Sequence, residues 1–316
     1  MNSLLQTEST AWVCSVPVAT VWTAPEKARP VDAKGIGAHS NINNWLQSMS
    51  PEDNQDLVNS NRIQTQLLYG EPVLIEEVVD GWAKIIALWQ PCQKDERGYP
   101  GWVPVDQLKE VANLAELGFA RVTQNKAQLW TEDFKPLKVV SFNTTLPVKE
   151  IGEFIRLQTP DGDALVMTEA VEIVDAYNQN LKGSGVDIAK LGAKFLDLPY
   201  LWAGMSSYGF DCSGFTYNLM KANGVIISRD AVDQVSEGSE IDPQNVEAWH
   251  IGDVLFFAHE EGKGKIHHVG VYYGNGLMLH APKPGKSVEI IELAGTKHEV
   301  ELCAIRRFTE IEDHED

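Results

Sequence analysis

The sequence has no long apolar run and few cysteines. No stretch of about 18 consecutive apolar residues, the minimum for a membrane-spanning helix, occurs in its 316 residues. The four cysteines are scattered along the chain and form no small disulfide framework. The N-terminal residues lack the basic start and apolar core of a secretory signal peptide. We therefore expect a cytoplasmic protein with no membrane partner.

Basic residues are also scarce, because 26 Lys and Arg stand against 45 Asp and Glu. The net charge of −19 argues against nucleic acid and other polyanionic partners. Such a charge favours small peptides with a free amine over an intact anionic wall polymer, although solubility alone explains it equally well.

Metal-binding motifs are missing too. Zinc sites favour clustered ligands such as Cys-x₂-Cys, whereas Cys14, Cys92, Cys212 and Cys303 lie far apart. The adjacent His267 and His268 do not have helical i, i+4 spacing. We expect no metal and no cofactor, although one cysteine with two histidines remains a possible ligand set.

Among the residues that are present, Cys212 has the most informative surroundings. It lies in the run Gly209-Phe-Asp-Cys-Ser-Gly214, directly before a helical pattern. A helix N-terminus carries a partial positive charge and unpaired N–H groups, which favour a thiolate. We therefore predict a cysteine nucleophile with a lowered pKa.

Two histidines downstream complete a catalytic pattern. His268 and His280 lie in two short strand-like runs joined by Gly274-Asn-Gly276, which predicts a hairpin. One histidine would act as the base and the other would hold it in one orientation. A lone buried cysteine is usually inert and a lone strand histidine is usually structural, so the prediction depends on their combination.

Six motifs in order make the last third of the chain resemble the NlpC family of cell-wall cysteine peptidases. They span about residues 185–308 and include Leu198-Pro-Tyr-Leu-Trp-Ala-Gly204, Ser228-Arg-Asp and Ile251-Gly-Asp-Val254. This resemblance implies a papain-like α+β core. It also implies that Cys212 is the nucleophile, His268 the general base, His280 its orienting group and Tyr200 an oxyanion ligand. Where the family usually has Trp-Gly-Gly, this chain has Ala203 in the middle position.

The rest of the chain is rich in short β-type runs separated by turns. Residues 1–112 predict a small SH3-like β-barrel with a helical insertion near residues 40–63, where Ser50 is a plausible N-cap before Pro51. Residues 113–178 predict a second SH3-like barrel. The expected fold is therefore α+β, with two small barrels preceding an NlpC catalytic domain at residues 179–316.

This arrangement resembles the γ-D-glutamyl-L-diamino acid endopeptidases. The resemblance implies cleavage of small murein peptides, L-Ala-γ-D-Glu-diamino acid, in cell-wall peptide recycling. The free N-terminal amine would be bound by Asp211 together with Tyr99 and Glu71 of the first barrel, with Gln64 near the same region. Ser213 would lie near the α-carboxylate of γ-D-Glu or the oxyanion.

Three other interpretations stay open. A broader peptidoglycan hydrolase or amidase would act on intact wall through wall-binding barrels. A scaffold protein would carry a degenerate catalytic domain, but every expected catalytic residue type is present. Another acyl transfer, such as amide-bond formation, would use the same acyl-enzyme chemistry.

Overall fold

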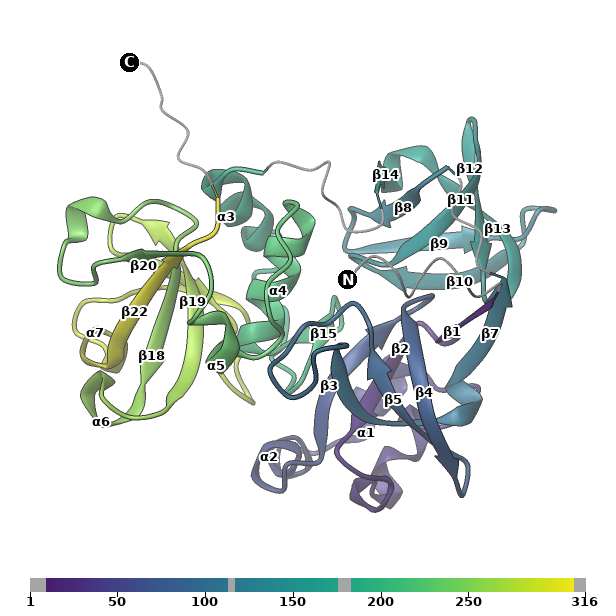
Figure 1. The fold of residues 1–316 in the computed structure, drawn as a ribbon, viewed down its shortest axis with the longest axis horizontal. Coiled ribbons are helices and arrows are strands. Elements are labelled where there is room, and N and C mark those ends of the chain that lie inside the picture. The colour runs from purple at the N-terminus through teal and green to yellow at the C-terminus, as the bar shows by residue number, and fades with distance from the viewer. Residues whose placement is uncertain (1–9, 113–116, 176–182, 310–316) are drawn as a thin grey trace. The chain divides into compact units, whose positions relative to one another are not determined.

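The structure is a computed structural model that describes residues 10–112, 117–175 and 183–309 (Figure 1). The described residues form two compact units. The first comprises the residues up to Gln90, those from Lys94 to 175, and Ser206–Tyr208, and the second comprises the remainder. The predicted domain boundaries after residues 112 and 178 lie outside the described residues.

The first unit begins with a seven-stranded antiparallel sheet in the order β3-β2-β6-β5-β4-β1-β7. Its central strands are built from apolar and β-branched residues; all five residues of β2, for example, are buried. The strands are β1 (Thr10–Cys14), β2 (Val18–Trp22), β3 (Ile63–Leu68), β4 (Pro72–Val79), β5 (Trp82–Ala87), β6 (Tyr99–Pro104) and β7 (Leu108–Ala112).

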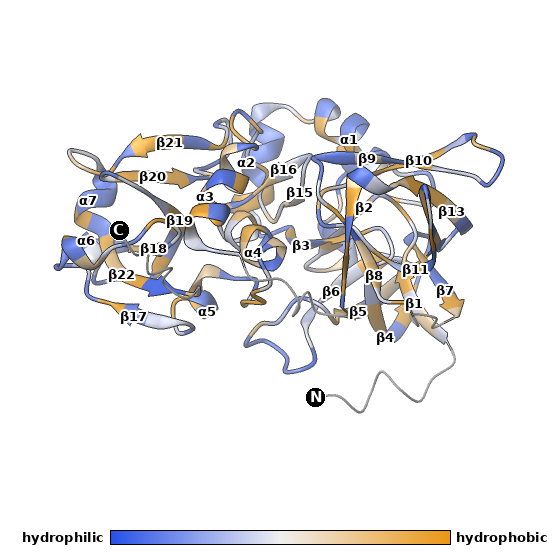
Figure 2. Ribbon diagram, turned by 90° about the horizontal axis from the view of Figure 1, so that it is seen from above, coloured by the Kyte–Doolittle hydropathy of each residue, from blue (hydrophilic) through white to orange (hydrophobic). Residues whose placement is uncertain are grey.

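The predicted helical insertion lies between β2 and β3. It contains the short 3-10 helices η1 (Pro25–Lys27) and η2 (Pro30–Gly35), followed by α1 (Ile42–Ser48) and α2 (Pro51–Asn59). Ser50 caps α2 as predicted, because its side chain accepts a hydrogen bond from the Asp53 N–H while Pro51 fills the first helical position. Figure 2 shows hydrophilic colours along α2 and hydrophobic colours on β2.

A second seven-stranded sheet has the order β10-β9-β13-β12-β11-β8-β14. The predicted Asp161-Gly162 hairpin is confirmed: β12 pairs with β13, and Gly162 has φ of 103°. The elements are β8 (Phe119–Val122), β9 (Lys126–Trp130), β10 (Pro136–Ser141), β11 (Thr145–Ile151), β12 (Phe154–Thr159), β13 (Gly162–Met167), η4 (Thr168–Ala170) and β14 (Val171–Val174). Alternate residues of these strands build an apolar core, which Tyr69 after β3 joins.

The second unit contains a six-stranded antiparallel sheet in the order β17-β22-β18-β19-β20-β21. Its strands are β17 (Ser239–Ile241), β18 (Val254–Ala258), β19 (Ile266–Gly274), β20 (Leu277–His280), β21 (Glu289–Glu292) and β22 (Leu302–Arg307). The helical elements are α3 (Gly185–Ala193), α4 (Cys212–Ala222), α5 (Ala231–Gln234), η5 (Val246–Ala248), α6 (His259–Gly262) and α7 (Lys297–Glu301). A short ribbon of β15 (Met205–Ser206) and β16 (Gly209–Phe210) precedes α4, and Ser206–Tyr208 within it belong to the first unit.

Helix α4 is the centre of the second unit. All eleven of its residues are buried, and it packs against α3 and β19 (Figure 1). A side chain at Gly214 in its first turn would place Cβ 2.2 Å from the Gly204 carbonyl oxygen, so only glycine permits this approach. Within the described ranges, no helix is long and apolar enough to cross a membrane.

Candidate active site

Cys212 is the first residue of α4, at the helix start that the sequence predicted. Asp211 is the N-cap, and its Oδ1 accepts a hydrogen bond of 2.6 Å from the Gly214 N–H. The glycine-rich turn therefore fixes the thiol at a helix N-terminus, where the free N–H groups of the first turn lie nearby.

The predicted lowering of the thiol pKa is wrong for the free protein. Burial raises the pKa of Cys212 to about 12, and the neighbouring Asp211 carboxylate raises it further. Arg229 and the backbone of Ser213 and Val269 act in the opposite direction but do not outweigh burial. Since only 8% of Cys212 is exposed, desolvation of the thiolate dominates over the helix N-terminus.

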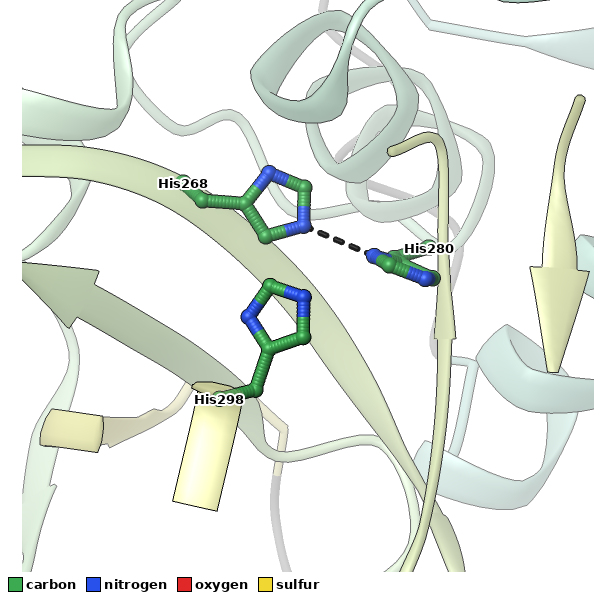
Figure 3. A group of neighbouring side chains, drawn as sticks. All are labelled: His268, His280 and His298. Carbon is green, nitrogen blue, oxygen red and sulfur yellow. Dashed lines mark hydrogen bonds between the residues drawn. The ribbon is translucent and has the colours of Figure 1, made fainter. Parts of the chain in front are cut away.

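His268 and His280 meet across the predicted hairpin. Strands β19 and β20 pair with Val271 opposite Leu279, and the His268 Nε2 lies 2.7 Å from the His280 Nδ1 (Figure 3). A hydrogen bond of this kind holds one imidazole in one orientation, which is the role expected for His280. The Nε2 of His280 faces Glu289 Oε1 at 3.5 Å, too far for a hydrogen bond.

Both imidazoles are neutral at neutral pH. Burial lowers the pKa of His268 well below its usual value and lowers that of His280 to about 3, and in each case the neighbouring histidines act in the same direction. The free site therefore holds an un-ionised thiol and an un-ionised base. Activation of Cys212 by His268 would therefore require a thiolate–imidazolium pair to form when substrate binds.

Tyr200 lies beside the nucleophile. Burial raises the pKa of its phenol well above 10, and the nearby Cys212 and Asp211 raise it further. Its backbone N–H donates to the Lys286 carbonyl at 2.8 Å, which fixes the residue before the turn that leads to α4. The phenol remains protonated and can donate a hydrogen bond to a developing oxyanion.

Arg229 is a residue of this site that the sequence analysis did not single out. Its Nη2 lies 2.7 Å from Asp211 Oδ2, and its Nη1 donates to Ser213 Oγ at 2.8 Å. Only 1% of Arg229 is exposed, so a buried ion pair lies directly beside the nucleophile. The motif containing Arg229 was visible in the sequence, but nothing local connected it to Asp211.

Comparisons with known proteins agree with this geometry. The model of the NlpC/P60 family matches residues 197–307, the YKFC SH3b2 domain matches 122–173 and the bacterial dipeptidyl-peptidase Sh3 domain matches 59–108. A γ-D-glutamyl-L-lysine dipeptidyl-peptidase of Bacillus subtilis is 43% identical over 92% of this chain and 96% of its own length. This chain belongs to the NlpC/P60 family.

Two further relatives support the family and the fold. The γ-D-glutamyl-L-lysine dipeptidyl-peptidase of Bacillus cereus is 36% identical over 93% of this chain and 89% of its own length. The crystal structure of an NlpC/P60 family protein from Bacillus cereus has a TM-score of 0.87 and 35% identity, covering 96% of this chain and all of that chain. The protein is therefore a cysteine peptidase, a hydrolase, with N-terminal SH3b domains and an NlpC/P60 domain.

Two of the predicted substrate ligands, Glu71 and Tyr99, belong to the first unit and not to the NlpC/P60 domain. Glu71 is buried, and its oxygens accept hydrogen bonds from the Leu68 N–H at 2.9 Å and from Gln90 Nε2 at 2.7 Å. These bonds give Glu71 a structural role in the turn after β3. Its binding of a substrate amine stays a prediction.

Tyr99 has a cationic neighbour in the same unit. The Lys94 ammonium contacts the Tyr99 hydroxyl, lies 4.1 Å from the centre of its ring and donates to Gln64 Oε1 at 3.0 Å. A substrate ammonium at this hydroxyl would meet a like charge. Binding of an amine by Tyr99 therefore requires Lys94 to move, and the role of Tyr99 also stays a prediction.

One group of metal-ligating side chains lies close together in the described part of the chain. It consists of His268, His280 and His298, whose ligand atoms lie within 4.8 Å of one another. The residues around His298 in the sequence form no catalytic motif, so no role was predicted for it. Only the packing of α7 beside the sheet brings it to His268 and His280.

Proposed function

We propose that this peptidase hydrolyses the γ-D-glutamyl–L-diamino acid bond of small murein peptides that carry a free N-terminal L-alanine. The observation that carries the proposal is the packing of α4, which begins at Cys212 next to the buried Asp211–Arg229 pair, against β19, which bears His268 bonded to His280. The names of the 43% and 36% identical relatives, which specify a γ-D-glutamyl-L-lysine bond, support this class of substrate.

The reaction begins with proton transfer from the Cys212 thiol to His268. For His268 to accept this proton at Nδ1, its Nε2 must carry a hydrogen and donate it to the His280 Nδ1, 2.7 Å away. The thiolate then attacks the γ-glutamyl carbonyl carbon. The Tyr200 hydroxyl and the Cys212 backbone N–H donate to the oxyanion, which stabilises the tetrahedral intermediate.

Collapse of the intermediate breaks the C–N bond. The His268 imidazolium returns its proton to the departing diamino-acid amine, which leaves an acyl-enzyme on Cys212. Neutral His268 then takes a proton from water, and the hydroxide attacks the thioester. Release of L-Ala-γ-D-Glu restores the thiol.

The Asp211–Arg229–Ser213 group supports the binding of a charged dipeptide. Ser213 Oγ accepts a hydrogen bond from Arg229, and its own hydroxyl donates to Asp211 Oδ1 over a long 3.4 Å, a contact that a substrate carboxylate would replace. The Asp211 carboxylate offers about four lone-pair sites, and the Gly214 N–H, Arg229 and the Ser213 hydroxyl use three of them. We propose that a remaining site accepts the alanine ammonium.

We also propose that the protein acts in the cytoplasm, in recycling of released peptides, which its acidic composition supports. Fractionation of cells expressing the full-length gene tests this location.

Mass spectrometry of digests tests the substrate class. The purified protein is incubated with L-Ala-γ-D-Glu-L-Lys, with the meso-diaminopimelate analogue, with N-acetylated forms of both and with intact peptidoglycan. We expect cleavage of the free-amine peptides only, and no cleavage by the Cys212→Ala variant. Equal cleavage of acetylated peptides, or release of fragments from intact peptidoglycan, would contradict the proposal and favour a wall hydrolase.

A further inference from the structure

Three buried imidazoles converge on one space in the NlpC/P60 domain. Figure 3 shows His268, His280 and His298 each turned toward the others. The ring centre of His298 lies 5.2 Å from that of His268 and 5.5 Å from that of His280. His298 is only 8% exposed, and its Nδ1 has no hydrogen-bond partner within the described residues.

The catalytic reaction requires only two of these histidines. His268 is the base and His280 orients it, whereas His298 has no step in the mechanism. A third imidazole buried at this position, with an unpaired ring nitrogen, costs desolvation energy without a compensating hydrogen bond. This unpaired group points to a ligand that the reaction itself does not use.

We propose that His268, His280 and His298 form a site for Zn²⁺ that reversibly inhibits the peptidase. Imidazole nitrogen is a preferred ligand of Zn²⁺, and three histidines with an open fourth position are an established coordination set. With Zn–N bonds of about 2.0–2.1 Å, two ligand nitrogens on a tetrahedral ion lie about 3.3 Å apart. The ligand atoms here lie within 4.8 Å of one another, so small ring rotations that move each nitrogen by roughly an ångström bring them to the spacing of a Zn²⁺ site.

Metal binding inhibits through the tautomer of His268. The bond between His268 Nε2 and His280 Nδ1 opens, and both nitrogens donate a lone pair to Zn²⁺. Neutral His268 must then carry its hydrogen on Nδ1, the nitrogen that has to accept the Cys212 proton. The Cys212 thiol can then no longer be activated. The inhibition is reversible, because no covalent bond within the protein changes and a chelator that removes Zn²⁺ restores the active tautomer of His268. This inhibition depends on the proposed function, whereas the metal site itself does not.

The binding experiment uses the full chain and Zn²⁺ alone, with no peptide, so its outcome is independent of the substrate. The Cys212→Ala variant is titrated against a chromophoric zinc chelator, because this change removes the competing thiol ligand. We expect one equivalent to bind. Adding His298→Asn or His298→Phe should weaken binding at least roughly tenfold, since loss of even an outer partner of a metal ligand weakens metal binding 10–100-fold. The matched control, His250→Gln, changes an exposed histidine of the same domain and should bind Zn²⁺ unchanged.

Two outcomes would overturn the metal site. One is loss of zinc binding in Cys212→Ala alone, and the other is unchanged binding in both His298 variants. X-ray absorption at the zinc edge of loaded Cys212→Ala protein requires no change at His298, so the proposal remains testable if both His298 variants unfold. Three imidazole ligands are expected there, and fewer would refute the site. In the wild type, a zinc-saturated enzyme that still cleaves its peptide would refute the inhibition while leaving the site intact.

Discussion

Replacing Arg229 with methionine tests whether the buried ion pair supports the nucleophile. Arg229 and Asp211 expose 1% and 6% of their side chains, and their closest atoms lie 2.7 Å apart. Methionine fills a similar volume but leaves the Asp211 carboxylate without its cation. The hydrogen bond from the Gly214 N–H to Asp211 remains, so compensation is only partial.

The expected cost is about 3–5 kcal/mol of unfolding free energy, because removing one partner of a buried pair leaves an uncompensated buried charge. The remaining Gly214 hydrogen bond favours the lower end of this range. Urea denaturation followed by circular dichroism measures the change. The double variant Arg229→Met/Asp211→Asn removes the unpaired charge and should recover part of the loss.

A surface ion pair provides the control. Arg97 bonds to Asp95 and Glu76 with 40% of its side chain exposed, so Arg97→Met should change stability far less than Arg229→Met. If Arg229→Met costs less than about 1 kcal/mol, or if the double variant is as unstable as the single one, an unpaired Asp211 charge is not the cause of the lost stability. Either result would refute the role of the ion pair beside Cys212.

Three other predictions concern the site. Tyr200→Phe should lower kcat about 10²–10³-fold with little change in KM, because an oxyanion donor acts mainly in the transition state, and a large rise in KM instead would contradict that role in steady-state assays. Folding lowers the pKa of His280 from 6.5 to about 3. As the pH falls, the unfolded chain therefore takes up this proton before the folded protein does, so the contribution of His280 to stability is complete above pH 6.5 and is lost as the pH falls toward 3. At pH 5 this loss is about 2 kcal/mol, and urea titrations should show a flatter dependence on pH for His280→Gln than for the wild type. Lys94→Met should lower KM several-fold for the free-amine peptide, since it removes a like charge beside Tyr99, and an unchanged KM would place the amine elsewhere.

Local signals in the sequence were sufficient for much of the secondary structure. The cap at Ser50 and the turn at Asp161-Gly162 depend on a few neighbouring residues, and the structure contains both. The hairpin between β19 and β20 follows from Gly274-Asn-Gly276 in the same way. Because this hairpin sets the register, the closeness of His268 and His280 was also predictable.

Properties that depend on packing were not predictable. The pKa of Cys212 reflects burial by the whole NlpC/P60 domain, which outweighs the local helix N-terminus used in the prediction. Arg229 lies 18 residues after Asp211 and reaches it only through the fold. His298 meets His268 and His280 for the same reason, because β21 separates α7 from β20 in the chain.

The raised pKa of Cys212 also has a consequence for the chemical durability of the enzyme. Peroxides and alkylating reagents attack thiolates, and a buried thiol with a pKa of about 12 presents almost none at neutral pH. The Cys212 thiol of the resting enzyme should therefore react slowly with peroxide and with iodoacetamide. The thiol of the resting enzyme is protonated and unreactive. Only when a bound peptide promotes transfer of the Cys212 proton to His268 would the resulting thiolate become open to oxidation and alkylation.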